Sequence, residues 1–115
     1  VLHRDLKTKN IFLCNNQKSI KVGDFGISKT LQSTNELAKT AIGTPFYVSP
    51  EICQGKEYNQ KSDMWSLGCV LYELAALKHA FDGTSVSELM KNICDEKYLP
   101  IPFEYSQEFI SVIDL

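Results

Sequence analysis

The segment that most constrains the fold is SDMWSLGCVLYELAAL, residues 62–77. Met64, Leu67, Gly68, Leu71, Leu74 and Ala75 recur there at helical spacing. The other faces are apolar as well, through Trp65, Cys69, Val70 and Tyr72. A helix that is apolar nearly all round belongs in the middle of a core. We therefore expect a central helix over 62–77, with Ser62 as its N-cap and Asp63 near its positive end.

Two further helices are expected after this segment. SVSE places Ser85 and Glu88 in capping-box register ahead of LMKNIC. SQEFISVIDL begins with Ser106 as a cap and continues with an apolar stripe: Phe109, Ile110, Ile113 and Leu115. Between the two helices, YLPIPFEY holds Pro100 and Pro102 and is expected to be a loop.

The N-terminal part predicts strands instead. IFLC at 11–14 and SIKVG at 19–23 are apolar-rich runs, and the intervening NNQK suits a tight turn through Asn15 and Asn16. These runs predict a small β-hairpin. From 24 to about 58 no period is sustained and glycine and proline recur, so we expect a loop, and a loop this long is usually functional.

Composition limits the class of protein. The 115 residues are 43% hydrophobic and 23% charged with a net charge of -2, which indicates one globular domain, or part of one, and argues against a nucleic-acid-binding surface. The four cysteines form no C-x-x-C pair, so we expect no zinc site and thiols without a redox role. No apolar run is long enough to span a bilayer and no signal-peptide pattern is present, so we expect an intracellular protein.

The residues that indicate chemistry lie near the N-terminus. HRDLKTKN holds Asp5, Lys7 and Asn10, and Asp24 follows the expected hairpin. Their order and spacing fit phosphoryl transfer, in which a protein mostly positions groups and neutralises charge. The Asp5 carboxylate is suited to accept the proton of an attacking hydroxyl, and the Lys7 ammonium is suited to stabilise the negative charge of the transferred phosphate. Asn10 and Asp24 offer the hard oxygen ligands that magnesium prefers.

At this point a family resemblance appears. HRDLKTKN, DFG at 24–26, SPE at 49–51 and DMWSLG, in that order, closely resemble motifs of eukaryotic protein kinases. They match the catalytic loop, the magnesium-binding loop, the motif that closes the activation segment, and the central helix of the C-terminal lobe. Lys7 and Thr44 are typical of serine/threonine kinases. ELAKTAIGTPFYVSPEIC and YNQKSDMWSLGCVLYELAALKHAFDG resemble the NIMA-related (NEK) kinases.

The resemblance implies the roles of the reacting groups. Asp5 would be the catalytic base and Lys7 the electrostatic stabiliser that also contacts ATP. Asn10 and Asp24 would hold the cofactor through Mg²⁺, with Mn²⁺ as an alternative ion. The Thr44 hydroxyl would contact Asp5 and Lys7.

Other residues would support this site. His3 would pack against Phe25, next to Gly26. Asp63 would accept hydrogen bonds from the backbone of the catalytic loop. Glu51 would pair with a late arginine that this sequence does not contain, so we expect it to lack its partner.

Regulation and selectivity are also implied. A phosphate on Thr40, rather than on Ser33 or Thr34, would pair with Arg4 and order the activation segment. Ile27 occupies the position at which a β-branched residue accompanies a preference for threonine over serine.

The implied fold is protein kinase-like (α+β): a mainly α-helical C-terminal lobe with a small β-hairpin. Residues 1–115 would be a partial kinase domain, from the catalytic loop to a late helix. The sequence has no G-x-G-x-x-G loop and no VAIK-like strand. We therefore expect the N-terminal lobe to be absent and the isolated chain to be inactive.

The expected function is ATP- and Mg²⁺-dependent phosphorylation of protein serine or threonine by a parent NIMA-related kinase. The alternative is a catalytically silent docking or inhibitory module, which has no physical need for the intact magnesium ligands. Expected partners are protein substrates and ATP, with neither nucleic acid nor a membrane span. The resemblance alone suggests cytoskeletal or centrosomal partners and a cytoplasmic, centrosomal or ciliary location.

Overall fold

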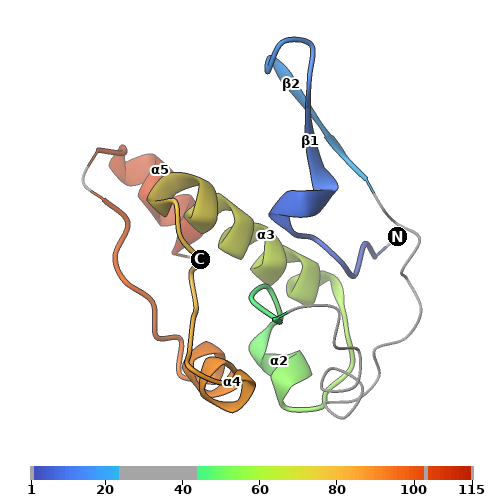
Figure 1. Ribbon diagram of the computed structural model, residues 1–115, viewed down its shortest axis with the longest axis vertical. Helices are drawn as coiled ribbons and strands as arrows, with labels where there is room; N and C mark the ends of the chain where they lie inside the picture. Colours follow the sequence, from blue (N-terminus) through green and yellow to red (C-terminus); the bar gives the residue numbers. More distant parts are fainter. Residues whose placement is uncertain (1, 24–43, 103, 115) are drawn as a thin grey trace.

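The computed structural model describes residues 2–23, 44–102 and 104–114. In chain order these contain the 3₁₀-helix η1 (Thr8–Asn10), strands β1 (Ile11–Cys14) and β2 (Ser19–Val22), and helices α2 (Pro50–Cys53), α3 (Gln60–Ala76), α4 (Val86–Cys94) and α5 (Gln107–Ile113). Helix α3 runs through the middle, α5 lies along its C-terminal half, α2 and α4 lie below it, and the hairpin projects away from the helices (Figure 1). The predicted mainly helical unit with one small hairpin is confirmed.

The hairpin has the predicted position. Its strands are antiparallel, in a register that pairs Ile11 with Val22 and Cys14 with Ser19. The turn residues Asn15, Asn16 and Gln17 all have positive φ angles, of 50, 53 and 66°. Asparagine tolerates this left-handed backbone better than most residues, which explains why the sequence indicated the turn.

The central helix begins earlier than predicted. The N-cap of α3 is Asn59, not Ser62, and its side chain accepts a hydrogen bond from the backbone N–H of Lys61 at 2.8 Å. Ser62 is the third helical residue, and its hydroxyl accepts the Asn59 N–H at 3.3 Å. The two residues therefore form a capping box, in which the serine plays the reciprocal role.

The expectation that α3 is buried all round is wrong for one face. Val70 and Tyr72 are only 1% and 2% exposed, whereas Met64 and Leu74 are each 60% exposed. Among the described elements, α5 contacts α3 on another side. The apolar face that includes Met64 and Leu74 therefore remains accessible in the described part of the chain.

Two apolar clusters hold the helices together. The first joins α2, α3 and α4 through Cys53, Cys69, Phe81, Leu89 and Ile93. The second joins α3 to α5 and to the preceding loop through Tyr72, Ala75, Ile101, Phe109, Ile110 and Ile113. The predicted stripe of the last helix is thus confirmed except at residue 115, which lies outside the described residues.

Two details of the shorter helices differ from expectation. Helix α2, with Pro50 in its first turn, interrupts the stretch that was predicted to be a loop as far as residue 58. In α4 the Ser85 hydroxyl accepts the Glu88 N–H at 3.1 Å, but the Glu88 carboxylate binds Thr84 at 2.7 Å rather than completing the box with Ser85. In the ranges that the structure describes, no helix is long and apolar enough to cross a membrane.

Candidate functional site

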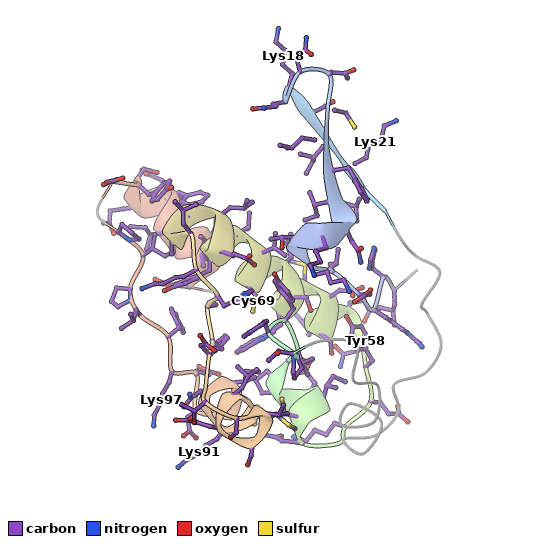
Figure 2. All side chains as sticks on the ribbon, viewed as in Figure 1. Lys18, Lys21, Tyr58, Cys69, Lys91 and Lys97 are labelled. Atoms are coloured by element: carbon purple, nitrogen blue, oxygen red, sulfur yellow. The ribbon has the colours of Figure 1, made fainter. Side chains whose placement is uncertain are left out.

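The N-terminal loop is attached to the first turn of α3. Both carboxylate oxygens of Asp63 accept backbone hydrogen bonds, from His3 at 2.8 Å and from Arg4 at 3.0 Å. The Tyr58 hydroxyl donates a third hydrogen bond to Asp63 at 2.5 Å, from a position next to the beginning of α3 (Figure 2). These are the loop contacts expected of Asp63.

The electrostatics keep this anchor charged. Burial alone would raise the pKa of Asp63, but the hydrogen bonds from Tyr58, His3 and Arg4 outweigh it and hold the pKa below its ordinary value of 3.8. Burial, together with the hydrogen bond to Asp63, raises the pKa of the Tyr58 hydroxyl. At neutral pH the pair is therefore a carboxylate and a protonated phenol, the states that favour this hydrogen bond.

His3 connects the loop to the end of the hairpin. Its side chain is 5% exposed, and Nδ1 accepts the backbone N–H of Asp5 at 3.1 Å. Nε2 lies 2.8 Å from the carbonyl oxygen of Gly23. Because Nδ1 is an acceptor, the proton of the neutral ring is on Nε2, which donates to Gly23. Phe25, its expected packing partner, lies outside the described residues.

Arg4 has an unusual backbone conformation. Its φ angle is 68°, in the left-handed region that non-glycine residues rarely adopt. The hydrogen bond from its N–H to Asp63 holds this conformation. Strained residues of this kind concentrate at functional sites, where the surrounding structure fixes them. Thr40, the phosphorylation site expected to act on Arg4, lies outside the described residues.

The structure brings Asp5, Lys7 and Asn10 together. The ammonium nitrogen of Lys7 lies 3.3 Å from Oδ2 of Asp5. The Asn10 amide nitrogen donates to the backbone oxygen of Asp5 at 2.8 Å and to its Oδ2 at 3.1 Å. Asn10 is the last residue of η1 and is only 5% exposed. Its backbone N–H donates to the Lys7 carbonyl at 3.0 Å, which closes the turn. A carboxylate, an ammonium and an amide therefore converge on one short loop.

The orientation of Asn10 bears on metal binding. Since only its nitrogen can donate to the two Asp5 oxygens, the amide oxygen Oδ1 points elsewhere, and no described residue donates a hydrogen bond to it. Such an oxygen fits Mg²⁺, which prefers hard oxygen ligands. Among the described residues no group of three or more His, Cys, Asp or Glu side chains is arranged to hold a metal ion. The second expected ligand, Asp24, lies outside the described residues, as do Phe25, Gly26 and Ile27.

The expected contact of Thr44 is not present. Thr44 is exposed, and within the described ranges no hydrogen bond joins its hydroxyl to Asp5 or Lys7. Tyr47 takes the place beside the loop, because its hydroxyl lies 3.0 Å from the Thr8 hydroxyl. The described residues therefore do not show the contact expected of Thr44.

The sequence motifs did not predict the polar contacts that join Tyr47, Glu73 and His79. The Tyr47 hydroxyl donates to the Glu73 carboxylate, and Nδ1 of His79 lies 3.6 Å from the same carboxylate. The His79 ring also stacks on Phe46, with ring centroids 3.6 Å apart. A single carboxylate in the apolar run LYELAAL was the sequence signal for this group. His79, which follows α3, is packed against the segment that precedes α2.

Glu51 has a partner after all. The Ser62 hydroxyl donates to its carboxylate at 2.6 Å, although the family resemblance had implied only a late arginine that this sequence lacks. Burial alone would raise the pKa of Glu51, but this hydrogen bond and several weaker interactions lower it below its ordinary value of 4.5. Ser62, buried at the start of α3, thus connects the Ser-Pro-Glu motif to the helix that holds Asp63.

Comparison with known proteins matches the same motifs. Residues 1–114 match the model of the protein kinase domain. The serine/threonine-protein kinase Nek5 of Homo sapiens is 54% identical over 113 residues, covering 98% of this chain and 16% of the relative. Nek8 of Danio rerio is also 54% identical over 98% of this chain and 16% of its own length. Nek1 of Mus musculus is 50% identical over 98% of this chain and 9% of its own length. The chain therefore spans less than a fifth of the length of these relatives.

Proposed function

This chain belongs to the protein kinase family, in which its relatives are NIMA-related serine/threonine kinases, and we propose that it provides the catalytic loop for phosphate transfer from ATP to protein serine or threonine. The observation that carries the proposal is the Asp5–Lys7–Asn10 cluster, held on the carboxylate of Asp63. Transfer of a phosphoryl group depends mainly on such positioning and on neutralised charge.

Each member of the cluster has a distinct task in this proposal. The Asp5 carboxylate accepts the proton of the attacking hydroxyl, which raises the nucleophilicity of the oxygen. Lys7, 3.3 Å from Asp5, stabilises the negative charge on the transferred phosphate. Asn10 fixes the Asp5 side chain through Nδ2 and would hold Mg²⁺, or Mn²⁺, through Oδ1 together with Asp24. When bound, the cation would neutralise charge on the phosphates of ATP.

Finer properties are part of the proposal. Ile27 would favour threonine over serine as the acceptor, and a phosphate on Thr40 would pair with Arg4. The isolated 115 residues would be inactive, because their sequence has no glycine-rich phosphate loop and no strand lysine. A cytoplasmic, centrosomal or ciliary location, with cytoskeletal or centrosomal partners, is proposed from the family resemblance alone.

A chimera tests the function directly. These residues would replace the matching region of human Nek5, which they resemble over 113 residues. Transfer of labelled phosphate from ATP to paired peptides that differ only in serine or threonine would then be measured. We expect activity with a preference for the threonine peptide, and Asp5→Asn should lower the rate by about 10²–10⁴-fold, the usual contribution of general base catalysis.

The control and the opposing outcome are equally specific. Lys9→Gln changes an exposed residue of the same turn and should leave the rate nearly unchanged. A chimera that is folded and binds ATP, yet transfers no phosphate, would favour the silent docking module. Equal rates for the two peptides would exclude only the role of Ile27.

A further inference from the structure

Helices α2 and α4 pack directly against each other, below α3 (Figure 1). Each of them ends in a cysteine: Cys53 is the last residue of α2, and Cys94 is the last residue of α4. Cys53 lies in the buried cluster with Leu89 and Ile93 of α4 and is 9% exposed. The two cysteines are far apart in the sequence, and the packing of α2 against α4 brings their helices together.

The position of Cys94 on α4 directs it toward the same interface. Met90 packs against the cluster that contains Cys53, and residues four apart lie on one face of a helix. Cys94 therefore follows Met90 along the side of α4 that faces this cluster, but it is itself exposed at the end of the helix. One thiol of this pair is open to solvent and the other is shielded.

The surroundings of the Cys53 thiol differ from those of the other buried cysteine of the cluster, Cys69. Burial raises the pKa of the Cys53 thiol to about 12, and the neighbouring Cys94 thiol adds to this rise. Burial likewise raises the pKa of Cys69 to about 12, without any contribution from another cysteine. Although Cys69 belongs to the same apolar cluster as Cys53, it lies in the middle of α3, where the helix fixes its backbone.

We propose that Cys53 and Cys94 are a redox-sensitive pair that closes to a disulfide when the protein meets a peroxide. The Cys94 thiolate attacks the O–O bond of hydrogen peroxide, giving a sulfenic acid and, after proton transfer, water. The Cys53 sulfur then attacks the Cys94 sulfur, so that an S–S bond forms and the S–O bond breaks. The hydroxyl leaves as water with the Cys53 proton. Two thiols are oxidised by two electrons and one peroxide is reduced to two waters.

The geometry accounts for the order of these steps. The exposed Cys94 is reached first by a small oxidant, whereas the surroundings of Cys53 exclude it. An S–S bond requires sulfur atoms about 2.05 Å apart. Because Cys94 ends its helix, its backbone can move without breaking the hydrogen bonds of the inner turns. The high pKa of Cys53 makes the second step slow at neutral pH and faster as the pH rises.

The disulfide would join two helices that pack against each other through the cluster of Cys53, Leu89 and Ile93. It would connect α2, which carries Glu51 of the Ser-Pro-Glu motif, to α4. The proposal does not depend on phosphate transfer, because it concerns only the thiols and the oxidant. Its failure would leave the proposed function untouched.

Peptide mapping of the full chain tests the pair. The protein would be treated with hydrogen peroxide at one equivalent, alkylated and digested with trypsin without reduction. Cys53 lies in the tryptic peptide 40–56 and Cys94 in the peptide 92–97. We expect these two peptides to be linked, with the loss of two hydrogens, and to separate after treatment with dithiothreitol. The linking rate should rise about tenfold per pH unit between about pH 7 and 8, as the thiolate fraction of Cys53 does.

Matched variants complete the test. Cys94→Ser changes an exposed residue and should abolish the link, as should Cys53→Ser, whereas Cys14→Ser in the hairpin should leave it intact. The same treatment in urea should give random pairings of all four cysteines. The proposal is overturned if Cys94 becomes a sulfinic acid while Cys53 stays a free thiol. It is also overturned if the 40–56/92–97 link is no more frequent in buffer than in urea, or if Cys94 links only to a second copy of the chain.

Discussion

The carboxylate of Asp63 accepts the backbone N–H of His3 at 2.8 Å, although the two residues are 60 positions apart in the chain. This contact sets the first turn of α3 beneath the loop that carries Asp5. The helix start and the loop are therefore one structural unit, and damage to the anchor should reach the cluster above it.

Removal of the anchor should destabilise the protein. Asp63→Ala leaves the N–H groups of His3 and Arg4 without their acceptor, and hydrogen bonds to charged groups contribute about 1.5–3 kcal/mol each. We expect the free energy of unfolding, measured in urea, to fall by about 3 kcal/mol. Asp95→Ala, which removes a surface carboxylate 3.7 Å from Lys97, should change it by less than about 0.5 kcal/mol. Equal losses in the two variants would contradict the anchor role.

The stability contributed by Asp63 should disappear in acid. Its pKa in the folded protein is below the ordinary value of 3.8, so the folded state binds the proton less readily than the unfolded state. The contribution is therefore complete above the ordinary pKa and is lost as the pH falls through the folded value. The difference in unfolding free energy between wild type and Asp63→Asn should be constant from about pH 5 to 7 and shrink below about pH 4. A difference that grows in acid would reverse the assigned sign.

Asn10 should not tolerate a carboxylate. In Asn10→Asp the two hydrogen bonds to Asp5 lose their donor, and a second negative charge is placed next to Oδ2 of Asp5. We expect a loss of about 3 kcal/mol in unfolding free energy, since the bond to the Asp5 carboxylate contributes about 1.5–3 kcal/mol and the bond to its backbone oxygen about 0.5–1.5 kcal/mol. Asn92→Asp offers a comparison, because Asn92 donates one exposed hydrogen bond to the Asp82 backbone. If Asn10→Asp were the milder variant, the contact between Asn10 and Asp5 would not be the stabilising one.

The Tyr47 hydroxyl should contribute to the stability of the fold through its hydrogen bond to Glu73. Tyr47→Phe keeps the ring but removes the hydrogen bond to the Glu73 carboxylate and the contact with Thr8. We expect a loss of about 1.5 kcal/mol in chemical denaturation, the lower value for a hydrogen bond to a charged group. Tyr98→Phe removes a similar bond to Asp114, which is exposed, and should cost clearly less. Equal losses in the two variants would show that the half-buried position of Tyr47 does not strengthen its hydrogen bond.

Two glycines should respond oppositely to alanine. A Cβ atom on Gly83 would lie 2.6 Å from the backbone nitrogen of Leu89, so Gly83→Ala forces the start of α4 to move and should cost about 1–3 kcal/mol. A Cβ atom on Gly68, inside α3, would meet no other part of the described chain within 4 Å, apart from the adjoining backbone of its own helix. Gly68→Ala should therefore stabilise the protein by about 0.5–1 kcal/mol, the difference in helix propensity. Thermal unfolding of the two variants should show shifts of opposite sign.

Local sequence patterns correctly predicted the turns, caps and helix faces that depend on residues close together in the sequence. The Asn-Asn turn, the Ser85 and Ser106 caps, and the apolar stripe of α5 all follow from contacts within about four residues. The same rules misplaced the cap of α3, because Asn59 and Ser62 both suit the position and only the backbone path after Tyr58 selects the asparagine. They also missed α2, which is too short to show a period.

The sequence by itself determined the type of each element and the residues of the catalytic loop, because hydrogen bonds of turns and caps act over short separations and the motifs stand close together. The family resemblance had already implied that Asp63 binds the backbone of the loop, but only the tertiary structure decided that Tyr47 meets Glu73, that Ser62 meets Glu51 and that α2 packs against α4. It also decided that Met64 remains exposed while Tyr72 is buried. Contacts of this kind depend on how the helices pack, and packing is set by the shapes of several surfaces at once, which no local pattern records.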